Sequence, residues 1–292
     1  MDKPETLFLH IVGCDVGIQC GDPQAVELLI ANYGQMRVDS FAAANLEYAI
    51  SRCRNGPGFR IARRGGEPLV AIDDSEFLFL LEKDLTIELQ KLRRNLYFVH
   101  AAVLGFSGRA FLLVAASGKG KSTTTWALLH HGFHYLSDEL GPLNLDNLEV
   151  QPYPHAICLK KEPPWPYCLP EKTVRTRATL YIPTPNLPNT AVTKPLPLMA
   201  VFFLEHSPRS NSPRVHHLSK AEAAARLFAQ ALNPLAHAED GLAGAAAIAR
   251  KVPSFCLDAG ELGLTCELVM KTLERTQETA IDPSPAADRS AL

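Results

Sequence analysis

The stretch that decides the fold is residues 110–140, which read AFLLVAASGKGKSTTTWALLHHGFHYLSDEL. The apolar run Ala110–Ala116 predicts a strand, the glycine-rich segment after it predicts a loop, and the following residues predict a helix that ends near His131. A second strand is expected at Phe133–Leu136, directly before a polar segment. This strand–loop–helix–strand order is typical of α/β proteins, which bind ligands beyond the carboxyl ends of their strands.

The predicted loop carries a nearly complete phosphate-binding motif. Residues 115–122, AASGKGKS, match the pattern G-x-x-x-x-G-K-[ST] at every position except the first. Gly118 and Gly120 allow backbone conformations that point successive N–H groups at phosphate oxygens. Lys121 supplies a positive charge for the β- and γ-phosphates, and the Ser122 hydroxyl suits Mg²⁺, which prefers hard oxygen ligands. The residues expected to bind nucleotide are Ala116, Ser117, Gly118, Lys119, Gly120, Lys121, Ser122 and Thr123.

The one departure from the motif is Ala115, which stands where the pattern has glycine. If the backbone at this position needs a positive φ, alanine costs about 1 kcal/mol relative to glycine, and the loop would be slightly reshaped. The alternative for the whole segment is a glycine turn between a strand and a helix, without a ligand. The apolar strand before the loop and the amphipathic helix after it favour the phosphate site.

Two adjacent acids, Asp138 and Glu139, follow the strand Phe133–Leu136, about 16 residues beyond the loop. A carboxylate at this place can hold Mg²⁺ or accept the proton of an attacking hydroxyl. Neighbours at a strand end point in different directions, so the pair offers both roles. His100 ends the apolar pair at 98–99; it could tune an acid, although a lone histidine in a core strand is more often structural.

Composition excludes several classes of function. The chain has 292 residues, with 29 Lys and Arg against 31 Asp and Glu, and this net charge of −2 argues against a nucleic-acid binder. The longest apolar runs, Ala110–Ala116 and Leu198–Leu204, are seven residues long, whereas a membrane-spanning helix needs about 20. Seven scattered cysteines and a charged N-terminus, unlike a signal peptide, predict reduced thiols and a cytoplasmic protein.

The sequence predicts a small α/β domain over residues 1–95, a nucleotide-binding domain over 96–276 and a disordered tail over 277–292. Residues 151–200 hold 11 of the 22 prolines, which predicts long extended connections that either form a binding surface or are poorly ordered. The expected elements of the first domain are strands at Leu7–Val12, Val16–Cys20, Leu46–Arg52 and Phe59–Arg63, helices at 22–36 and Glu82–Asn95, and a separate apolar run at Phe77–Leu81. Those of the second domain include strands at Phe98–Leu104, Met199–Glu205 and Val252–Leu257 and helices at Lys220–Leu235 and Glu261–Arg275.

Residues 100–140 resemble the catalytic core of the HPr kinase/phosphorylase family, which shares the phosphoenolpyruvate-carboxykinase type of nucleotide-binding fold. The family pattern is a histidine-containing strand, a second strand, G-x-S-G-x-G-K-S, a helix ending near glycine, and a strand closing on two aspartates. The matching residues here are His100, Ser117–Ser122, Gly132, Asp138 and Glu139. The resemblance implies an α/β protein whose P-loop domain has a mixed β-sheet.

The resemblance also implies an ATP- and Mg²⁺-dependent kinase that phosphorylates a hydroxyl. Its catalytic residues would be Asp138, His100 and Lys121, with Asp138 accepting the hydroxyl proton and His100 assisting it. Ser122, Asp138 and Glu139 would hold the metal, and the base and metal roles of the two acids could be exchanged. Further positive charge is expected from the proline-rich segment, where the candidates are Lys160, Lys161, Arg175 and Arg177.

The chain lacks the Arg-Pro-Gly-Arg-Asn signature that accompanies phosphorylase activity and HPr recognition, and this departure leaves both properties open. It is more similar to HPr kinase-related proteins, which occur beside peptide-modifying genes and include enzymes that phosphorylate a serine of a precursor peptide. Residues 153–161, YPHAICLKK, resemble the proline-containing strand of those relatives. The expected partner is a protein or peptide with an acceptor serine, and the family's oligomers allow a homo-oligomer. The alternatives are a small-molecule hydroxyl kinase and a non-catalytic scaffold that binds nucleotide and, through residues 6–95, a peptide.

Overall fold

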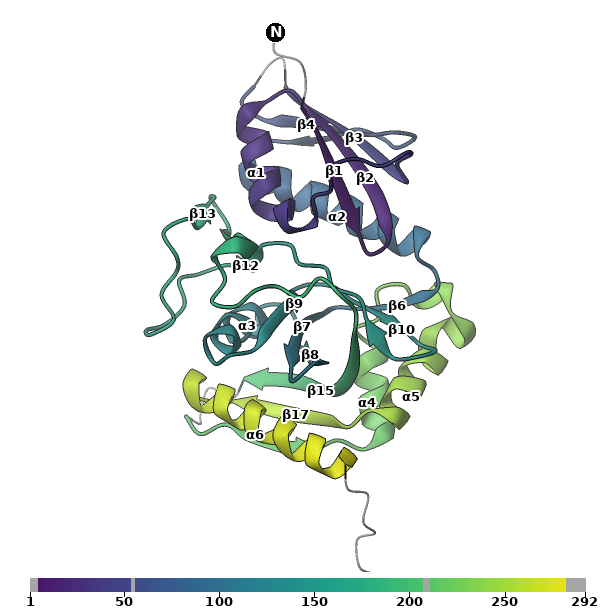
Figure 1. The fold of residues 1–292 in the computed structure, drawn as a ribbon, viewed down its shortest axis with the longest axis vertical. Helices are drawn as coiled ribbons and strands as arrows, with labels where there is room; N and C mark the ends of the chain where they lie inside the picture. The colour runs from purple at the N-terminus through teal and green to yellow at the C-terminus, as the bar shows by residue number, and fades with distance from the viewer. Residues whose placement is uncertain (1–4, 54–55, 207–210, 282–292) are drawn as a thin grey trace, which may run out of the picture.

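The computed structural model describes residues 5–53, 56–206 and 211–281. An N-terminal unit with one sheet and two helices lies above a larger body built on a second sheet (Figure 1). The chain is therefore a mixed α/β protein with several sheets. None of the described helices is long and apolar enough to cross a membrane.

The N-terminal sheet has five strands in chain order, with the β1–β2 hairpin antiparallel and β2–β3 parallel. Burial alternates along β1, and Leu7, Leu9 and Ile11 are buried on one face because successive side chains of a strand point to opposite faces. The elements are β1 (Glu5–Ile11), β2 (Cys14–Cys20), α1 (Pro23–Tyr33), β3 (Leu46–Arg52), β4 (Phe59–Arg63), β5 (Leu69–Ala71) and α2 (Asp74–Leu92). A 3₁₀ turn, η1 (Gly34–Met36), follows α1.

Helix α2 corrects the prediction of a separate apolar run at Phe77–Leu81. The run belongs to one continuous helix, because Phe77, Leu81, Leu85 and Leu89 recur every four residues and are all buried. The helix begins at Asp73, whose side chain accepts a hydrogen bond from the Glu76 N–H at 2.9 Å.

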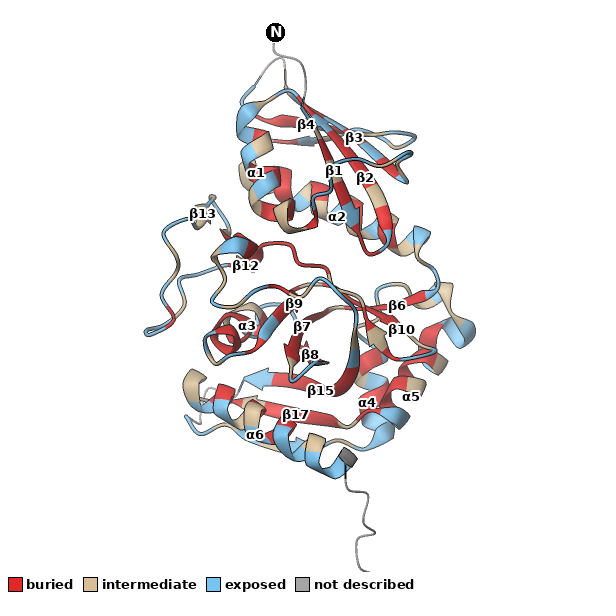
Figure 2. Ribbon diagram, in the orientation of Figure 1, coloured by how far each residue is buried: buried red, intermediate tan, exposed pale blue. Residues whose placement is uncertain are grey.

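The larger body has a mixed sheet between two layers of helices. Its central strands β8, β15 and β17 are parallel to one another, and the strand order is β6-β10-β11-β15-β8-β7-β9, with β17 beside β15 and β16. The strands are β6 (Leu96–Val99), β7 (Ala101–Phe106), β8 (Arg109–Val114), β9 (His134–Ser137), β10 (Gly141–Asn144), β11 (Glu149–Val150), β15 (Leu196–His206), β16 (Arg214–His217) and β17 (Ser254–Ala259). Most of these strands are buried along their length (Figure 2).

Alternate residues of this sheet pack against different helices. One face, with Phe111 and Phe202, packs on α3 (Lys121–His130) and α6 (Leu262–Ile281), whereas the other, with Leu112 and Val201, packs on α4 (Lys220–Phe228) and α5 (Leu242–Lys251). The sheet is therefore the middle layer of three, which leaves its strand ends as the exposed place for a site.

The proline-rich segment forms an ordered three-stranded sheet rather than a poorly ordered excursion. Its strands are β12 (Ile157–Leu159), β13 (Val174–Arg175) and β14 (Leu180–Ile182), with the short 3₁₀ helix η2 (Thr184–Asn186) after them. Tyr153, Ala156 and Tyr181 pack into the core of the N-terminal unit, whereas Ile157 and Ile182 pack into the core beside α3. The segment thus packs against both parts of the molecule, and it lies between α1 and α3 (Figure 1).

Two helix predictions near the C-terminus are wrong at their ends. The helix predicted to reach Leu235 ends at Phe228, because the chain after it turns to pair with β6: the Leu232 N–H donates to the Phe98 carbonyl. Two 3₁₀ turns, η3 (Pro234–Ala236) and η4 (Ala238–Gly241), and the unpredicted helix α5 follow. Helix α6 extends to Ile281, so residues 277–281 are helical; the rest of the predicted tail, 282–292, lies outside the described residues.

Asp22 holds the start of α1 and gives a first testable prediction. Its carboxylate accepts from the Ala25 N–H at 2.9 Å and from Arg52 Nε at 2.7 Å. Replacing it by alanine removes the cap and the ion pair, so we expect a loss of about 1–2 kcal/mol in the free energy of unfolding, measured by urea denaturation. Asp22→Asn keeps the cap and should lose clearly less; equal losses would contradict the capping role.

The same carboxylate predicts a pH dependence. Partial burial would raise the pKa of Asp22, but the hydrogen bonds from Arg52 and the Ala25 N–H outweigh it and hold that pKa below its ordinary value. Its contribution to stability is therefore full above the pKa of the unfolded carboxyl, about 3.9, and is lost as the pH falls through the lower folded pKa. The difference in stability between the parent and Asp22→Asn should shrink over that acidic range.

Candidate active site

The loop between β8 and α3, residues 115–120 (the glycine loop), has positive φ angles at two of its glycines. Gly118 and Gly120 have φ of +80° and +90°, a region that favours glycine, and a Cβ at either position would meet nothing within 4 Å. Residues 116–120 are exposed, and Gly120 is the N-cap of α3. The first N–H groups of α3 therefore face an open loop, which is a favourable place for an anion.

The backbone strain that a positive φ would cause at Ala115 is absent from the structure. The positive φ angles of the loop lie at Gly118 and Gly120, and Ala115 is not among the residues with a positive φ. Its side chain is buried at the end of β8, in the core that packs on α3. An alanine fits this position without backbone strain.

Lys121 lies in the first turn of α3 and points toward the end of β9. Its ammonium group donates to the Asp138 carbonyl oxygen, and it lies 3.5 Å from Asp138 Oδ1 and 3.4 Å from Glu139 Oε1. Burial would lower the pKa of Lys121, but the Asp138 and Glu139 carboxylates outweigh it and raise that pKa above its ordinary value. Lys121 is therefore a buried, fully charged ammonium group next to the glycine loop.

Asp138 is fully buried, and neither of its carboxylate oxygens has a hydrogen-bond partner. A buried carboxylate without donors is costly unless a cation balances it, and Lys121 at 3.5 Å does this only in part. Two free oxygen atoms at this point fit Mg²⁺, a hard cation that takes carboxylate oxygens. Ser122, half-buried in the first turn of α3, offers the hydroxyl that the motif assigns to the same ion.

His100 lies at the break between β6 and β7, so the single strand predicted for Phe98–Leu104 is in fact two. Its Nε2 lies 2.8 Å from Glu139 Oε2, and its backbone N–H donates to the Gln230 carbonyl oxygen. Burial would raise the pKa of Glu139, but the hydrogen bond with His100 and the charge of Lys121 lower it to about 2. The prediction that His100 assists Asp138 is therefore not what the geometry favours, since His100 pairs with Glu139.

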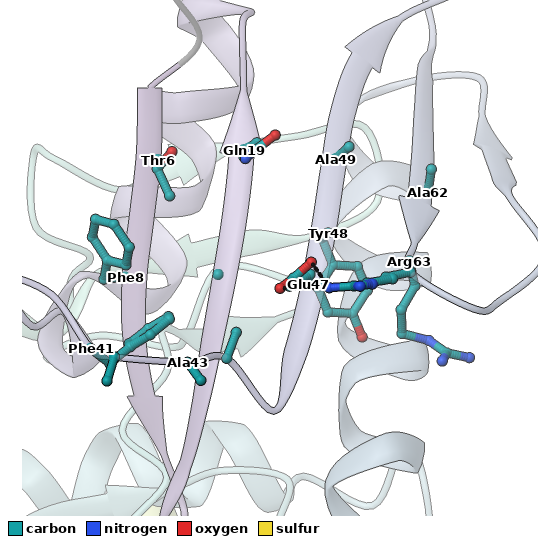
Figure 3. Close-up of a pocket in the computed structure, with 14 residues that line it drawn as sticks. Thr6, Phe8, Gln19, Phe41, Ala43, Glu47, Tyr48, Ala49, Ala62 and Arg63 are labelled. Atoms are coloured by element: carbon teal, nitrogen blue, oxygen red, sulfur yellow. Dashed lines mark hydrogen bonds and ion pairs between the residues drawn. The ribbon is translucent and has the colours of Figure 1, made fainter.

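The structure has cavities beside the cluster of Lys121, Asp138, Glu139 and His100 and also on the N-terminal sheet. One of about 880 Å³ has His100 and Glu139 in its wall, and one of about 380 Å³ adjoins the glycine loop at Lys119, beside Arg226. A third, of about 480 Å³, lies on the open face of the N-terminal sheet, where Phe41 packs on Phe8 (Figure 3). The third cavity contains none of the predicted site residues.

Of the four cations predicted to approach the site, the structure places two at the cavity of about 880 Å³. Lys160 and Arg177 line it together with His100 and Glu139, whereas Lys161 does not, and Arg175 lies 2.5 Å from Glu162. Sequence reasoning missed the part played by α2, which forms the opposite wall. The available signal was Phe79 on the polar side of the leucine stripe, which leaves this large apolar side chain exposed.

No known family model matches the chain, and no curated protein matches it. Among solved structures, the chain is similar to the HPr(Ser) kinase/phosphatase from Coxiella burnetii, with 13% sequence identity and a TM-score of 0.34. That match covers 63% of this chain and 97% of the other. The resemblance is distant.

Proposed function

We propose that the chain is an ATP- and Mg²⁺-dependent kinase that transfers the γ-phosphoryl group to a hydroxyl, in particular a serine of a protein or peptide. The observation that carries the proposal is the unpartnered, buried carboxylate of Asp138 beside Lys121 at the start of α3. The resemblance of residues 100–140 to the HPr kinase/phosphorylase family supports the same conclusion, including a phosphoenolpyruvate-carboxykinase type of fold.

In this proposal the glycine loop binds the phosphates of ATP through its backbone N–H groups, and the ammonium of Lys121 turns from the Asp138 carbonyl to the terminal phosphates. The movement of Lys121 replaces a contact within the chain by a contact to the substrate, and the exposed loop N–H groups gain a partner. Bound Mg²⁺ would neutralise charge on the transferring phosphoryl group, and Asp138 with Ser122 would hold it. Phosphoryl transfer depends mainly on positioning and charge neutralisation, which is what these groups offer.

The geometry favours the exchanged roles for the two acids. Asp138 has no exposed surface, whereas Glu139 faces the cavity of about 880 Å³ in a hydrogen bond with His100. We therefore assign the metal to Asp138 and proton acceptance from the acceptor hydroxyl to the Glu139–His100 pair. A base with a low pKa suffices, because little proton transfer is needed in a loose transition state.

The test is transfer of label from [γ-³²P]ATP, with Mg²⁺, to serine peptides, free serine and a panel of small alcohols. We expect labelled peptide, no labelling after chelation by EDTA, and none with Lys121→Ala. Labelling of free serine or an alcohol alone would identify a small-molecule kinase instead. Tight ATP binding without transfer to any acceptor would contradict the kinase proposal and favour a nucleotide-binding scaffold.

A further inference from the structure

The cavity of about 880 Å³ is lined by the outer face of α2 and by the small sheet β12–β14, and His100 and Glu139 line it as well. We call it the α2 cleft. We propose that it binds the acceptor as an extended peptide segment with acidic and bulky apolar side chains near its serine. This inference rests on the proposed kinase function, because it assigns the acceptor of that reaction.

Helix α2 has a second face that its own unit does not cover. Glu76, Phe79, Lys83, Ile87 and Gln90 are three or four residues apart, so they share one side of the helix, and all of them line the cleft. Phe79 is 62% exposed and Ile87, about two turns further along the same side of the helix, is 40% exposed, although both are large apolar side chains. This wall offers contacts to apolar side chains of an occupant.

The charges of the cleft favour an acidic occupant. Each acidic residue at the cleft already accepts a hydrogen bond within the chain; these acids are Asp73, Glu76, Glu82 and Glu139. Among the described residues, in contrast, no hydrogen bond or ion pair engages the side chains of Lys83, Lys160 and Arg177. The hydrogen bonds to Asp73, Glu76 and Glu82 come from neutral donors, so these acids on the α2 side keep their negative charge. The wall formed by β12–β14, however, brings Lys160 and Arg177 and no acid to the cleft, so acidic side chains of an occupant would complement that wall.

The dimensions favour a peptide over a small molecule. Glu76 and Gln90 are 14 residues apart on one helix, and at a rise of 1.5 Å per residue this wall is about 21 Å long. An extended chain rises about 3.3 Å per residue, so about six residues would span it.

The part of the cleft that Glu139 lines is where a serine hydroxyl would meet the reacting groups. Glu139 lines the cleft and lies 3.4 Å from the ammonium of Lys121, which in turn lies in the first turn of α3. A serine hydroxyl that is hydrogen-bonded to Glu139 would therefore lie close to Lys121, the residue expected to hold the terminal phosphate. The cleft and the glycine loop are two sides of one site.

The experiment uses a library of heptapeptides with a central serine and Glu, Lys or Leu at the flanking positions. Binding to the full chain is measured by fluorescence anisotropy, and phosphorylation by transfer from labelled ATP. We expect selection of peptides with both Glu and Leu, and about tenfold weaker binding, with a higher KM and little change in kcat, for the double variant Lys160→Glu/Arg177→Glu. Phe79→Ser should weaken the binding of the same peptides.

Matched controls are Lys172→Glu, an exposed lysine outside the cleft on the β12–β13 connection, and Leu264→Ser, an exposed leucine on α6. Neither should change binding or transfer. The cleft assignment would be overturned if the cleft variants phosphorylate peptides as well as the parent does, or if no peptide of the library binds. Binding that depends on the cleft without any transfer would leave the peptide site in place and overturn the kinase function instead.

Discussion

Asp138→Asn is expected to lower phosphoryl transfer by a factor on the order of 10²–10⁴, because a bound metal ion stabilises the transition state by several kcal/mol, while leaving the fold as stable as the parent or more stable. Asparagine has nearly the same shape but carries no charge, so it provides a poor ligand for a divalent cation. The carboxylate that it replaces is fully buried and has no hydrogen-bond partner, so the parent already bears the cost of keeping it there. Transfer from labelled ATP and thermal unfolding of the apo protein measure the two effects.

The matched control for this variant is Asp146→Asn, since Asp146 is an exposed aspartate on the β10–β11 turn. Both activity and stability should be unchanged there. Undiminished transfer by Asp138→Asn would remove the metal site from its assigned place. A large loss of stability in this variant would show instead that the carboxylate serves the fold.

The second large effect is expected for Lys121→Ala, which should lose ATP binding and also destabilise the apo protein by about 3 kcal/mol. The ammonium of Lys121 is the cation closest to the buried Asp138, at 3.5 Å, and its removal leaves that charge uncompensated. Urea denaturation measures the stability, and isothermal titration calorimetry measures the binding of ATP.

A double-mutant cycle separates the two roles of this lysine. In Lys121→Ala/Asp138→Asn the uncompensated charge is gone, so much of the stability should return while ATP binding stays absent. Losses that simply add would mean that the lysine and the aspartate are not coupled. Lys121→Arg keeps the charge and should retain most of the stability.

The glycine loop could be predicted from sequence because its signals are local. The spacing of Gly118, Gly120 and Lys121, with an apolar strand before them and a helix after them, fixes the local conformation, and the structure has this conformation at these residues. The same holds for β1 and β2, which lie close to the strands predicted at Leu7–Val12 and Val16–Cys20.

The pairing of His100 with Glu139 could not be predicted in this way. It depends on the register of β6 against β10, in which Val99 lies opposite Gly141 and so brings residues 100 and 139 together. Register depends on packing across the whole sheet, and no local pattern near His100 reports it.

The α2 cleft was still harder to predict from sequence, because its two walls are far apart in the chain. The sequence shows that α2 is amphipathic, but it does not show what faces Phe79. The other wall, around Lys160 and Arg177, comes from the proline-rich segment, whose strands β12–β14 are too short to give a periodic signal.

The interleaved core around Tyr153, Ala156 and Tyr181 has a consequence for how such a chain can change over time. These residues follow the predicted boundary at residue 95 but are buried among the side chains of the N-terminal unit. A recombination event that exchanged only the first 95 residues would therefore leave large aromatic groups without a matching surface. We therefore expect the two parts to be inherited together, and a new specificity of the α2 cleft to be acquired by point substitutions along its walls rather than by exchange of a module.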